Sequence, residues 1–172
     1  MLQSCLLKGK LLLQNIIRML LPAVSDALQG AGWHWRGVVV WNKRSSRPHV
    51  GRFRQQCEYI LFGSKGRFLP MHRTCFPGVF DIPVVTQNKV HLTSKPVALV
   101  RELLGVTRPG ALVLDPFIGG GTTAVAALET GRSCVGIELS EDYAKIARRR
   151  CESVGTAGGS KSASEILLHQ VK

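Results

Sequence analysis

Acidic residues are scarce in this 172-residue sequence, which has 11 Asp and Glu against 23 Lys and Arg. The resulting net charge of +12 favours a polyanionic partner, most simply a nucleic acid. Because 45% of the residues are apolar and only 20% are charged, the composition excludes a disordered or low-complexity chain. At this length we expect one domain with its own buried core.

Cysteine and histidine are also few, at five residues each, and neither forms a ligand pattern. No two cysteines lie within four positions of each other, and no two histidines stand four positions apart. The spacing therefore gives no support to a zinc site, and an odd number of cysteines does not suit a fully disulfide-bonded secreted protein. We expect reduced thiols, no metal and a cytoplasmic location.

A long hydrophobic run is absent as well. The most apolar stretch, residues 11–24, is interrupted by Gln14, Asn15 and Arg18, so it is too short and too polar to span a bilayer. The pattern predicts an amphipathic core helix, without a targeting signal and without a membrane partner. The apolar side chains that share one face of this helix are Leu13, Ile16, Ile17, Leu20 and Val24.

Alternating helix and strand patterns fill most of the remaining chain. The helix patterns cover residues 18–32, 96–104, 122–129 and 141–151. The strand patterns cover residues 37–41, 57–62, 111–114 and 133–137. This alternation predicts an α/β protein with a mainly parallel sheet, and the composition of the last twenty residues predicts a frayed tail.

The most informative segment is the turn Asp115-Pro-Phe-Ile-Gly-Gly-Gly-Thr-Thr123, between a predicted strand and a predicted helix. A glycine turn at this place lets a ligand approach the backbone at the helix N-terminus. Glu138 stands seventeen positions after Gly121, at the end of the next strand, where a carboxylate can accept hydrogen bonds from ribose hydroxyls. The pattern indicates a site for a cofactor that contains a nucleoside.

Two cofactors suit a glycine turn of this kind. Gly119, Gly121 and Ala124 match the dinucleotide pattern G-x-G-x-x-G/A, so a nicotinamide oxidoreductase is one alternative. Asp115 argues against it, because a carboxylate beside the turn repels a pyrophosphate and suits a cationic ligand. S-adenosylmethionine carries an ammonium and a sulfonium but no phosphate, and is therefore the favoured cofactor. A P-loop is excluded because no lysine follows the glycines.

The glycine turn and three segments upstream of it resemble the DNA amino-methyltransferases, which methylate adenine N6 or cytosine N4. The upstream segments are Trp41-Asn-Lys43, Glu58-Tyr-Ile-Leu-Phe-Gly-Ser-Lys-Gly66 and Thr93-Ser-Lys-Pro96. The resemblance implies a Rossmann-like α/β sheet of an adenosylmethionine-dependent methyltransferase with permuted motif order, incomplete at the N-terminus.

The same resemblance divides the chain. A target-side half over residues 18–90 precedes a cofactor half over residues 91–152, and double-stranded DNA is the implied partner. Residues 1–17 then form an atypical N-terminal segment, and residues 153–172 form a flexible tail.

The resemblance also assigns three groups of cofactor-binding residues. The loop group consists of Asp115, Phe117, Gly119, Gly121, Thr122 and Thr123. Glu138 holds the ribose. The third group, Thr93, Ser94 and Lys95, closes over the methionine end of the cofactor.

One segment of the family is missing. The family places Asp or Asn, two prolines and an aromatic residue at the target amine, where polar groups hydrogen-bond the amine and the ring stacks on the extruded base. No two prolines are adjacent in this sequence. Asp115-Pro-Phe belongs to the glycine turn, and Asp81-Ile-Pro lacks the second proline and the aromatic residue, so no catalytic residue is assigned.

Two hypotheses follow from this absence. The first is a DNA amino-methyltransferase that lacks its N-terminal part, and the second is a remnant or subunit that binds adenosylmethionine and DNA without methyl transfer. Loss of the strand that carries the missing segment is expected to leave an open sheet edge and apolar surface, which invite self-association.

The positive charge is concentrated in residues 33–75. This stretch contains nine Lys or Arg against one acid and so holds eight of the twelve surplus charges. It also holds all three tryptophans, and the aromatic residues of its predicted strands are expected in the core. Basic side chains neutralise phosphates, so the loop within this stretch is the predicted DNA contact. The residues assigned to phosphate contact are Lys43, Arg44, Arg47, Arg52 and Arg54.

Overall fold

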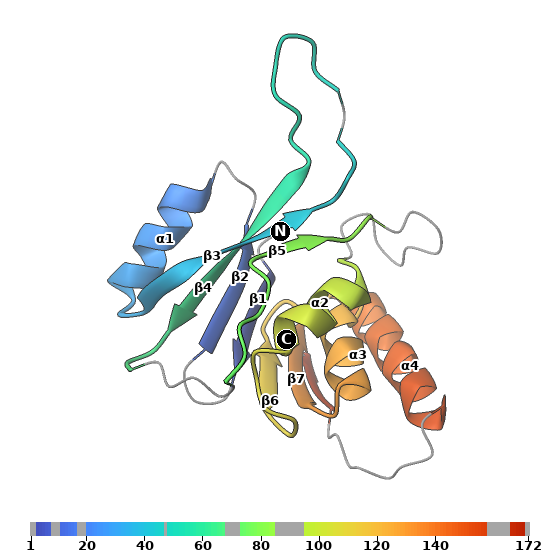
Figure 1. The fold of residues 1–172 in the computed structure, drawn as a ribbon. Coiled ribbons are helices and arrows are strands. Elements are labelled where there is room, and N and C mark those ends of the chain that lie inside the picture. The colour runs from blue at the N-terminus through green and yellow to red at the C-terminus, as the bar shows by residue number, and fades with distance from the viewer. Residues whose placement is uncertain are drawn as a thin grey trace.

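The computed structural model describes residues 3–7, 11–16, 20–46, 48–67, 73–84, 95–157 and 166–170, and for 3–7, 14–16, 155–157 and 166–170 it describes the backbone alone. Within these residues, eight strands form one sheet in the order β5-β3-β4-β2-β1-β6-β7-β8 (Figure 1). The strands are β1 (Gln3–Leu7), β2 (Leu11–Ile16), β3 (His34–Asn42), β4 (Cys57–Ser64), β5 (Val79–Asp81), β6 (Leu112–Asp115), β7 (Ser133–Glu138) and β8 (Ile166–Gln170). The helices are α1 (Leu21–Gly30), α2 (Val97–Leu104), α3 (Thr122–Glu129) and α4 (Glu141–Ala157).

The sheet is mixed. Parallel pairing joins β3 to β5, β6 to β7 and β7 to β8, whereas the other four neighbouring pairs are antiparallel. The predicted α/β class is confirmed, but the expectation of a mainly parallel sheet is wrong. Following these pairings, β1 and β4 run in one direction and the other six strands run in the opposite direction. The C-terminal ends of β3, β5, β6 and β7 therefore lie along one edge, which we call the carboxyl edge.

The N-terminal region corrects two expectations. Residues 11–16 form β2 in the middle of the sheet, and α1 begins only at Leu21, so the helix expected over residues 11–24 is wrong in its first part. Leu11, Leu12 and Leu13 are all buried. A strand that is covered on both faces is apolar throughout, and helical periodicity does not distinguish such a run from a helix. Among the described residues, β1 pairs with both β2 and β6, so the side of β6 that faces the N-terminal strands is covered, and the expected self-association stays a prediction.

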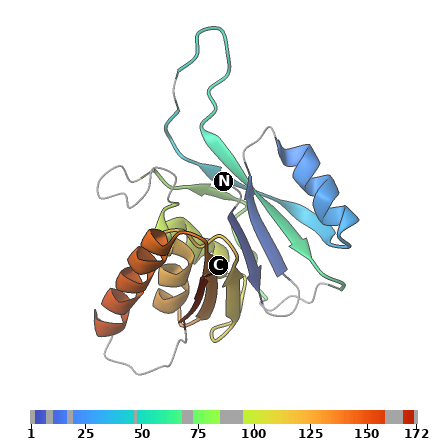
Figure 2. The ribbon, with the colours of Figure 1, turned by 180° about the vertical axis from the view of Figure 1, so that it is seen from behind.

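The core consists of two clusters that α2 connects. One cluster lies under the cofactor half and includes Leu104 and Val113, while the other includes Leu99 and Trp41. Trp41 is buried, as expected for an aromatic residue in a strand. The views in Figures 1 and 2 show α2, α3 and α4 grouped beside β6 and β7, and α1 beside β3. The two halves thus share one continuous sheet.

Residues 153–157 and 166–170 of the C-terminal region form regular structure that was not expected. The last helix continues to residue 157, and β8 adds to the sheet through parallel pairing with β7, from Cys134↔Ile166 to Glu138↔Gln170. The expectation of a frayed tail over 153–172 is therefore wrong for residues 153–157 and 166–170. Pairing with β7 stabilises the short strand β8. This pairing is a tertiary contact that local composition does not reveal.

A buried arginine joins two segments at the edge of the sheet opposite the carboxyl edge. Arg132 is only 6% exposed, and its guanidinium donates to the Thr107 hydroxyl at 2.8 Å, to the Thr107 carbonyl at 2.6 Å and to the Thr130 carbonyl at 2.6 Å. Burial lowers the pKa of Arg132. These bonds join the start of β7 to the segment after α2, which is a structural role.

Candidate cofactor site and basic loop

Two carboxylates stand at the ends of neighbouring parallel strands. Asp115 is the last residue of β6 and Glu138 the last residue of β7, and the register pairs Asp115 with Gly136. Both strands end at the carboxyl edge, where the glycine turn leads into α3. The structure therefore brings together the two acids that the sequence singled out, on either side of the turn.

Asp115 is completely buried. Its Oδ1 accepts a hydrogen bond from the backbone N–H of Phe117 at 3.0 Å, which fixes the first part of the turn. Burial raises the pKa of the nearby Cys134 thiol, and the negative charge of Asp115 raises it further. A buried carboxylate at this place makes the floor of the turn electronegative, which opposes the binding of phosphate groups.

Glu138 connects the turn to β7. Its Oε2 accepts the backbone N–H of Gly119 at 2.8 Å, and its Oε1 accepts the backbone N–H of Ser140 at 2.9 Å. A carboxylate has about four acceptor positions. Two bonds from the chain leave capacity for the hydroxyls of a ligand, so Glu138 both orders the turn and can bind a ribose.

The glycines of the turn differ in what surrounds them. Gly119 has φ +52°, and a Cβ placed on it would meet no atom within 4 Å. Gly121 has φ +81°, and a Cβ there would lie 2.8 Å from the Ala147 Cβ. Gly119 thus leaves open space beside the acids, whereas Gly121 allows α3 to start in close contact with α4.

Helix α4 supports the turn through residues that sequence reasoning missed. The Nη1 of Arg150 donates to the Gly120 carbonyl oxygen and lies 3.4 Å from the Thr122 Oγ1. Arg150 stands three positions after Ala147, so both are on the same face of α4. No local signal marks either residue, because their contact with the turn depends on how two distant helices pack.

Thr122 and Thr123 begin α3 as predicted, and both are buried. Two apolar residues beside the turn are exposed instead, Phe117 at 57% and Leu139 at 76%. Sequence reasoning assigned Phe117 but missed Leu139, although an apolar residue directly after the strand-end acid is a usable signal. Exposed apolar surface next to an acid with free acceptor capacity is suited to covering the base of a nucleoside.

The third predicted cofactor group is only partly described. Thr93 and Ser94 lie outside the described residues. The Lys95 Nζ is 3.0 Å from Glu58 Oε2 and 5.9 Å from the centre of the Trp41 ring. The structure therefore places the Lys95 ammonium at β4, three strands away from β6.

Glu58 also binds Lys43, whose Nζ is 3.2 Å from Oε1. Burial by itself raises the pKa of Glu58, but the charges and hydrogen bonds of Lys95 and Lys43 lower it more, so the pKa ends below its ordinary value. Lys43 follows β3, whereas Lys95 stands 52 positions later in the chain, two residues before α2. The three side chains form a half-buried cluster that joins the start of α2 to the sheet.

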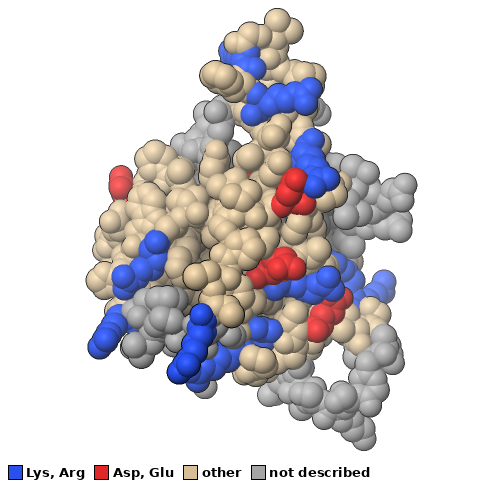
Figure 3. All heavy atoms as spheres, in the orientation of Figure 1, with Lys and Arg blue, Asp and Glu red and all other residues tan. Residues whose placement is uncertain are grey.

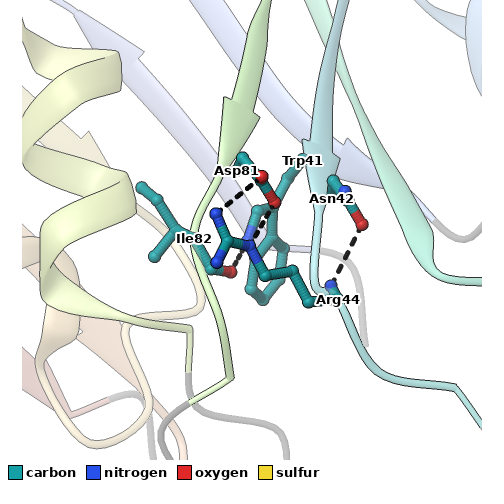
Figure 4. Close-up of polar contacts among 5 residues, drawn as sticks. All are labelled: Trp41, Asn42, Arg44, Asp81 and Ile82. Atoms are coloured by element: carbon teal, nitrogen blue, oxygen red, sulfur yellow. Dashed lines mark hydrogen bonds and ion pairs between the residues drawn. The ribbon is translucent and has the colours of Figure 1, made fainter.

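The β3–β4 loop, residues 43–56, carries the other predicted site (Figure 1). At its base the Arg44 guanidinium forms two hydrogen bonds of 2.7 Å with the two Asp81 oxygens, and the Trp41 Nε1 donates to the Ile82 carbonyl at 2.7 Å (Figure 4). The Arg44 hydrogen bonds hold the pKa of Asp81 below its ordinary value. We call the Arg44–Asp81 pair the loop clamp.

The five basic residues predicted to contact DNA are therefore not equivalent. Lys43 and Arg44 are paired with acids, and Arg47 lies outside the described residues. Arg52 and Arg54 are exposed, and no acid of the described part of the chain lies within 4 Å of their guanidinium groups. Figure 3 shows basic side chains on the projecting loop at the top of the view.

The described residues bear on two further expectations, the membrane and the metal. No helix among them has the length and hydrophobicity needed to cross a membrane. In the same part of the chain, no cluster of three or more His, Cys, Asp or Glu side chains is arranged to hold a metal ion.

Known proteins share sequence with the region that contains the glycine turn. Residues 72–149 match the family model described as DNA methylase. The chain is 37% identical over 141 residues to the type II methyltransferase M.SmaI of Serratia marcescens, covering 72% of this chain and 48% of that protein. It is 30% identical over 150 residues to the type II methyltransferase M2.DpnII of Streptococcus pneumoniae, covering 76% of this chain and 56% of that protein. The chain thus spans about half the length of these relatives.

A solved structure shows the same fold. The crystal structure of an M1.HpyAVI–SAM complex superimposes with a TM-score of 0.67 at 26% identity, covering 79% of this chain and 71% of that one. The matched family region contains the glycine turn, both strand-end acids and Lys95. Sequence and fold agree, and the chain belongs to the DNA methylase family that includes the N6- and N4-methyltransferases.

Proposed function

We propose that this chain binds S-adenosylmethionine at the glycine turn. The observation that carries the proposal is the pair of carboxylates that bind the turn, the buried Asp115 at Phe117 and Glu138 at Gly119, where a Cβ would meet no atom. A cationic nucleoside suits this acidic turn, whereas the pyrophosphate of a dinucleotide is repelled by it. The M1.HpyAVI structure, a complex with the same compound, supports the proposal.

Each part of the turn has a role in this proposal. The free acceptor capacity of Glu138 binds the ribose hydroxyls, and Gly119 lets the ligand approach the backbone. Phe117 and Leu139 cover the base. The buried negative charge of Asp115 attracts the cationic end, and the cofactor supplies the activated methyl group.

The proposed reaction is transfer of that methyl group to an exocyclic amine, adenine N6 or cytosine N4, in double-stranded DNA. Family membership and the type II methyltransferase relatives support this substrate class. The carboxyl edge also supports it, because the basic β3–β4 loop leaves the same edge as the glycine turn. A duplex held by the loop therefore faces the cofactor site.

Calorimetric titration with S-adenosylmethionine tests the cofactor proposal. Asp115→Asn and Glu138→Gln are each expected to weaken binding about ten- to hundred-fold, because each removes a charged partner of the ligand. Glu141→Gln changes an exposed acid at the start of α4 and is the matched control, with unchanged affinity expected. Binding of NAD in place of S-adenosylmethionine, or equal affinity in all variants, contradicts the proposal.

A second candidate is a chain that binds the cofactor and DNA without methyl transfer. The absence of adjacent prolines favours it, since the family places two prolines at the target amine. Transfer of a radiolabelled methyl group to duplex DNA, measured beside the calorimetric titration, separates the two functions. Stoichiometric labelling supports the enzyme, whereas cofactor binding without labelling supports the second candidate.

A further inference from the structure

The β3–β4 loop is a projecting hairpin on an anchored base. The Lys43 N–H donates to the Gln56 carbonyl at 2.8 Å, which closes the hairpin next to the sheet. The loop clamp and the Lys43–Glu58 ion pair hold the same end. Beyond this base the loop extends away from the sheet, as both ribbon views show (Figures 1 and 2).

The end of the loop presents apolar side chains to solvent. The Arg52 N–H donates to the His49 carbonyl at 3.3 Å, and Gly51 has φ +70°, which together form a reverse turn. Val50 and Phe53 around this turn are 103% and 97% exposed. An aromatic ring that is held out in water between two arginines, Arg52 and Arg54, is a feature typical of a contact surface.

The positive charge around Phe53 indicates the kind of partner that the loop binds. Residues 43–56 contain five Lys or Arg and no acid. A nucleic acid offers both phosphates for the guanidinium groups and base faces for the ring. An acidic protein surface offers the charge but has no regular set of aromatic faces, so the combination favours a nucleic acid.

The position of the loop fits this partner. The loop leaves the C-terminal end of β3, and strand directions place that end on the carboxyl edge with Asp115 and Glu138. A duplex bound by the end of the loop therefore runs past the proposed cofactor site.

We propose that Phe53 inserts its ring against the bases of duplex DNA while Arg52 and Arg54 contact the flanking phosphates. Lys43 and Arg44 anchor the loop and do not contact phosphates, because Glu58 and Asp81 occupy them. The inference deepens the proposed function and rests on it, since it names the part of the chain that holds the DNA. Insertion of an apolar wedge between base steps distorts the duplex locally, which assists extrusion of a target base.

The first test measures DNA affinity by fluorescence anisotropy with a duplex that contains 2-aminopurine. The wild-type chain is expected to increase the 2-aminopurine fluorescence, whereas Phe53→Ala is expected to weaken binding about ten-fold and to abolish that increase. Trp35→Ala is the matched control, because Trp35 is a half-exposed aromatic residue at the opposite edge of the sheet, and both signals are expected to remain. Thermal melts verify that the variants fold.

The second test measures the salt dependence of the same binding. Arg52→Ser with Arg54→Ser is expected to reduce the slope of log K against log salt by about 1.8, whereas Lys43→Ser leaves the slope unchanged. If the Phe53 and arginine variants keep the wild-type affinity and slope, the inference is overturned, and a loop that docks on a protein would give this result. Calorimetric cofactor binding would then still stand. A wild-type chain that binds no DNA overturns the inference together with the DNA part of the proposed function.

Discussion

The glycine turn and the β3–β4 loop leave the same edge of the sheet but are held in different ways. The turn is fixed from inside, by the buried Asp115, by Glu138 and by the packing of Gly121 on Ala147. Among its described residues, the loop is held to the sheet at its base, by exposed or half-buried ion pairs and by the Lys43–Gln56 backbone hydrogen bond. A rigid turn suits a small ligand of defined shape, whereas a projecting loop suits a large polyanion.

The largest expected effect is a loss of stability on substituting the turn glycines, and it separates the contribution of packing from that of backbone strain. Gly121→Ala places a methyl group against Ala147 at a left-handed φ, so we expect a loss of about 3 kcal/mol in the free energy of unfolding. Gly119→Ala meets no neighbouring atom and is expected to lose about 1 kcal/mol, as is Gly51→Ala in the loop. Urea unfolding of the three variants measures these values, and equal losses contradict the packing role of Gly121.

The next effect concerns the half-buried cluster at the root of the loop. Glu58→Gln leaves Lys43 and Lys95 without their acid, and we expect a loss of about 1–2 kcal/mol at pH 7. The folded state holds the pKa of Glu58 below its ordinary value. The ionised Glu58 therefore stabilises the fold at pH values above that ordinary pKa, and this stabilisation is lost as the pH falls through the pKa of the folded state.

Unfolding of wild type and Glu58→Gln as a function of pH checks this sign. The difference between the two proteins is expected to shrink as the pH falls from 5 to 3, roughly the range over which a carboxyl of this kind titrates. Asp26→Asn, at an exposed acid of α1, is the control and follows wild type throughout. A difference that is constant over this range contradicts the ionic origin of the effect.

A smaller effect is expected when the loop clamp is removed. Both members of the Arg44–Asp81 pair are about half exposed, so solvent screens their attraction. Asp81→Ala is therefore expected to leave the melting temperature unchanged but to speed tryptic cleavage within residues 43–56 several-fold. Asp26→Ala, at an exposed acid of α1, is the control. A fall in melting temperature without faster cleavage shows that the clamp stabilises the fold and not the loop.

The smallest effect uses the cysteines as reporters of the two regions. Cys75 is exposed and Cys57, at the root of the loop, is half-buried, whereas Cys134 and Cys151 are buried beneath the turn. Burial raises the pKa of Cys151 to about 11, so the folded state favours the neutral thiol. The resulting contribution to the free energy of unfolding is present below pH 9 and is lost as the pH rises from 9 towards 11.

At pH 8 a thiol reagent is expected to modify Cys75 first and Cys57 more slowly, with Cys134 and Cys151 modified only on unfolding. Mass spectrometry of the labelled protein measures this order. Early labelling of Cys151 in the folded protein contradicts the close packing of α4 beneath the turn.

Local sequence patterns predicted the elements around the glycine turn well. The turn from Asp115 to Thr123 and the helix that follows it are determined by glycine freedom and helix-start chemistry within a few residues. The N-terminal strands were not predicted, because Leu11, Leu12 and Leu13 in a strand buried on both faces look the same as part of a core helix. The support of the turn by Arg150 was not predicted either, since it depends on helix packing.

The sequence by itself determined the α/β class, the glycine turn with its two strand-end acids and the position of the basic loop. The tertiary structure decided which charges are available, because Glu58 and Asp81 come from other strands and neutralise Lys43, Lys95 and Arg44. It also decided that Phe53 is exposed between two arginines that form no ion pair with the acids of the described residues. Pairing of charges and burial of side chains depend on neighbours distant in the chain, whereas a turn depends on the residues within it.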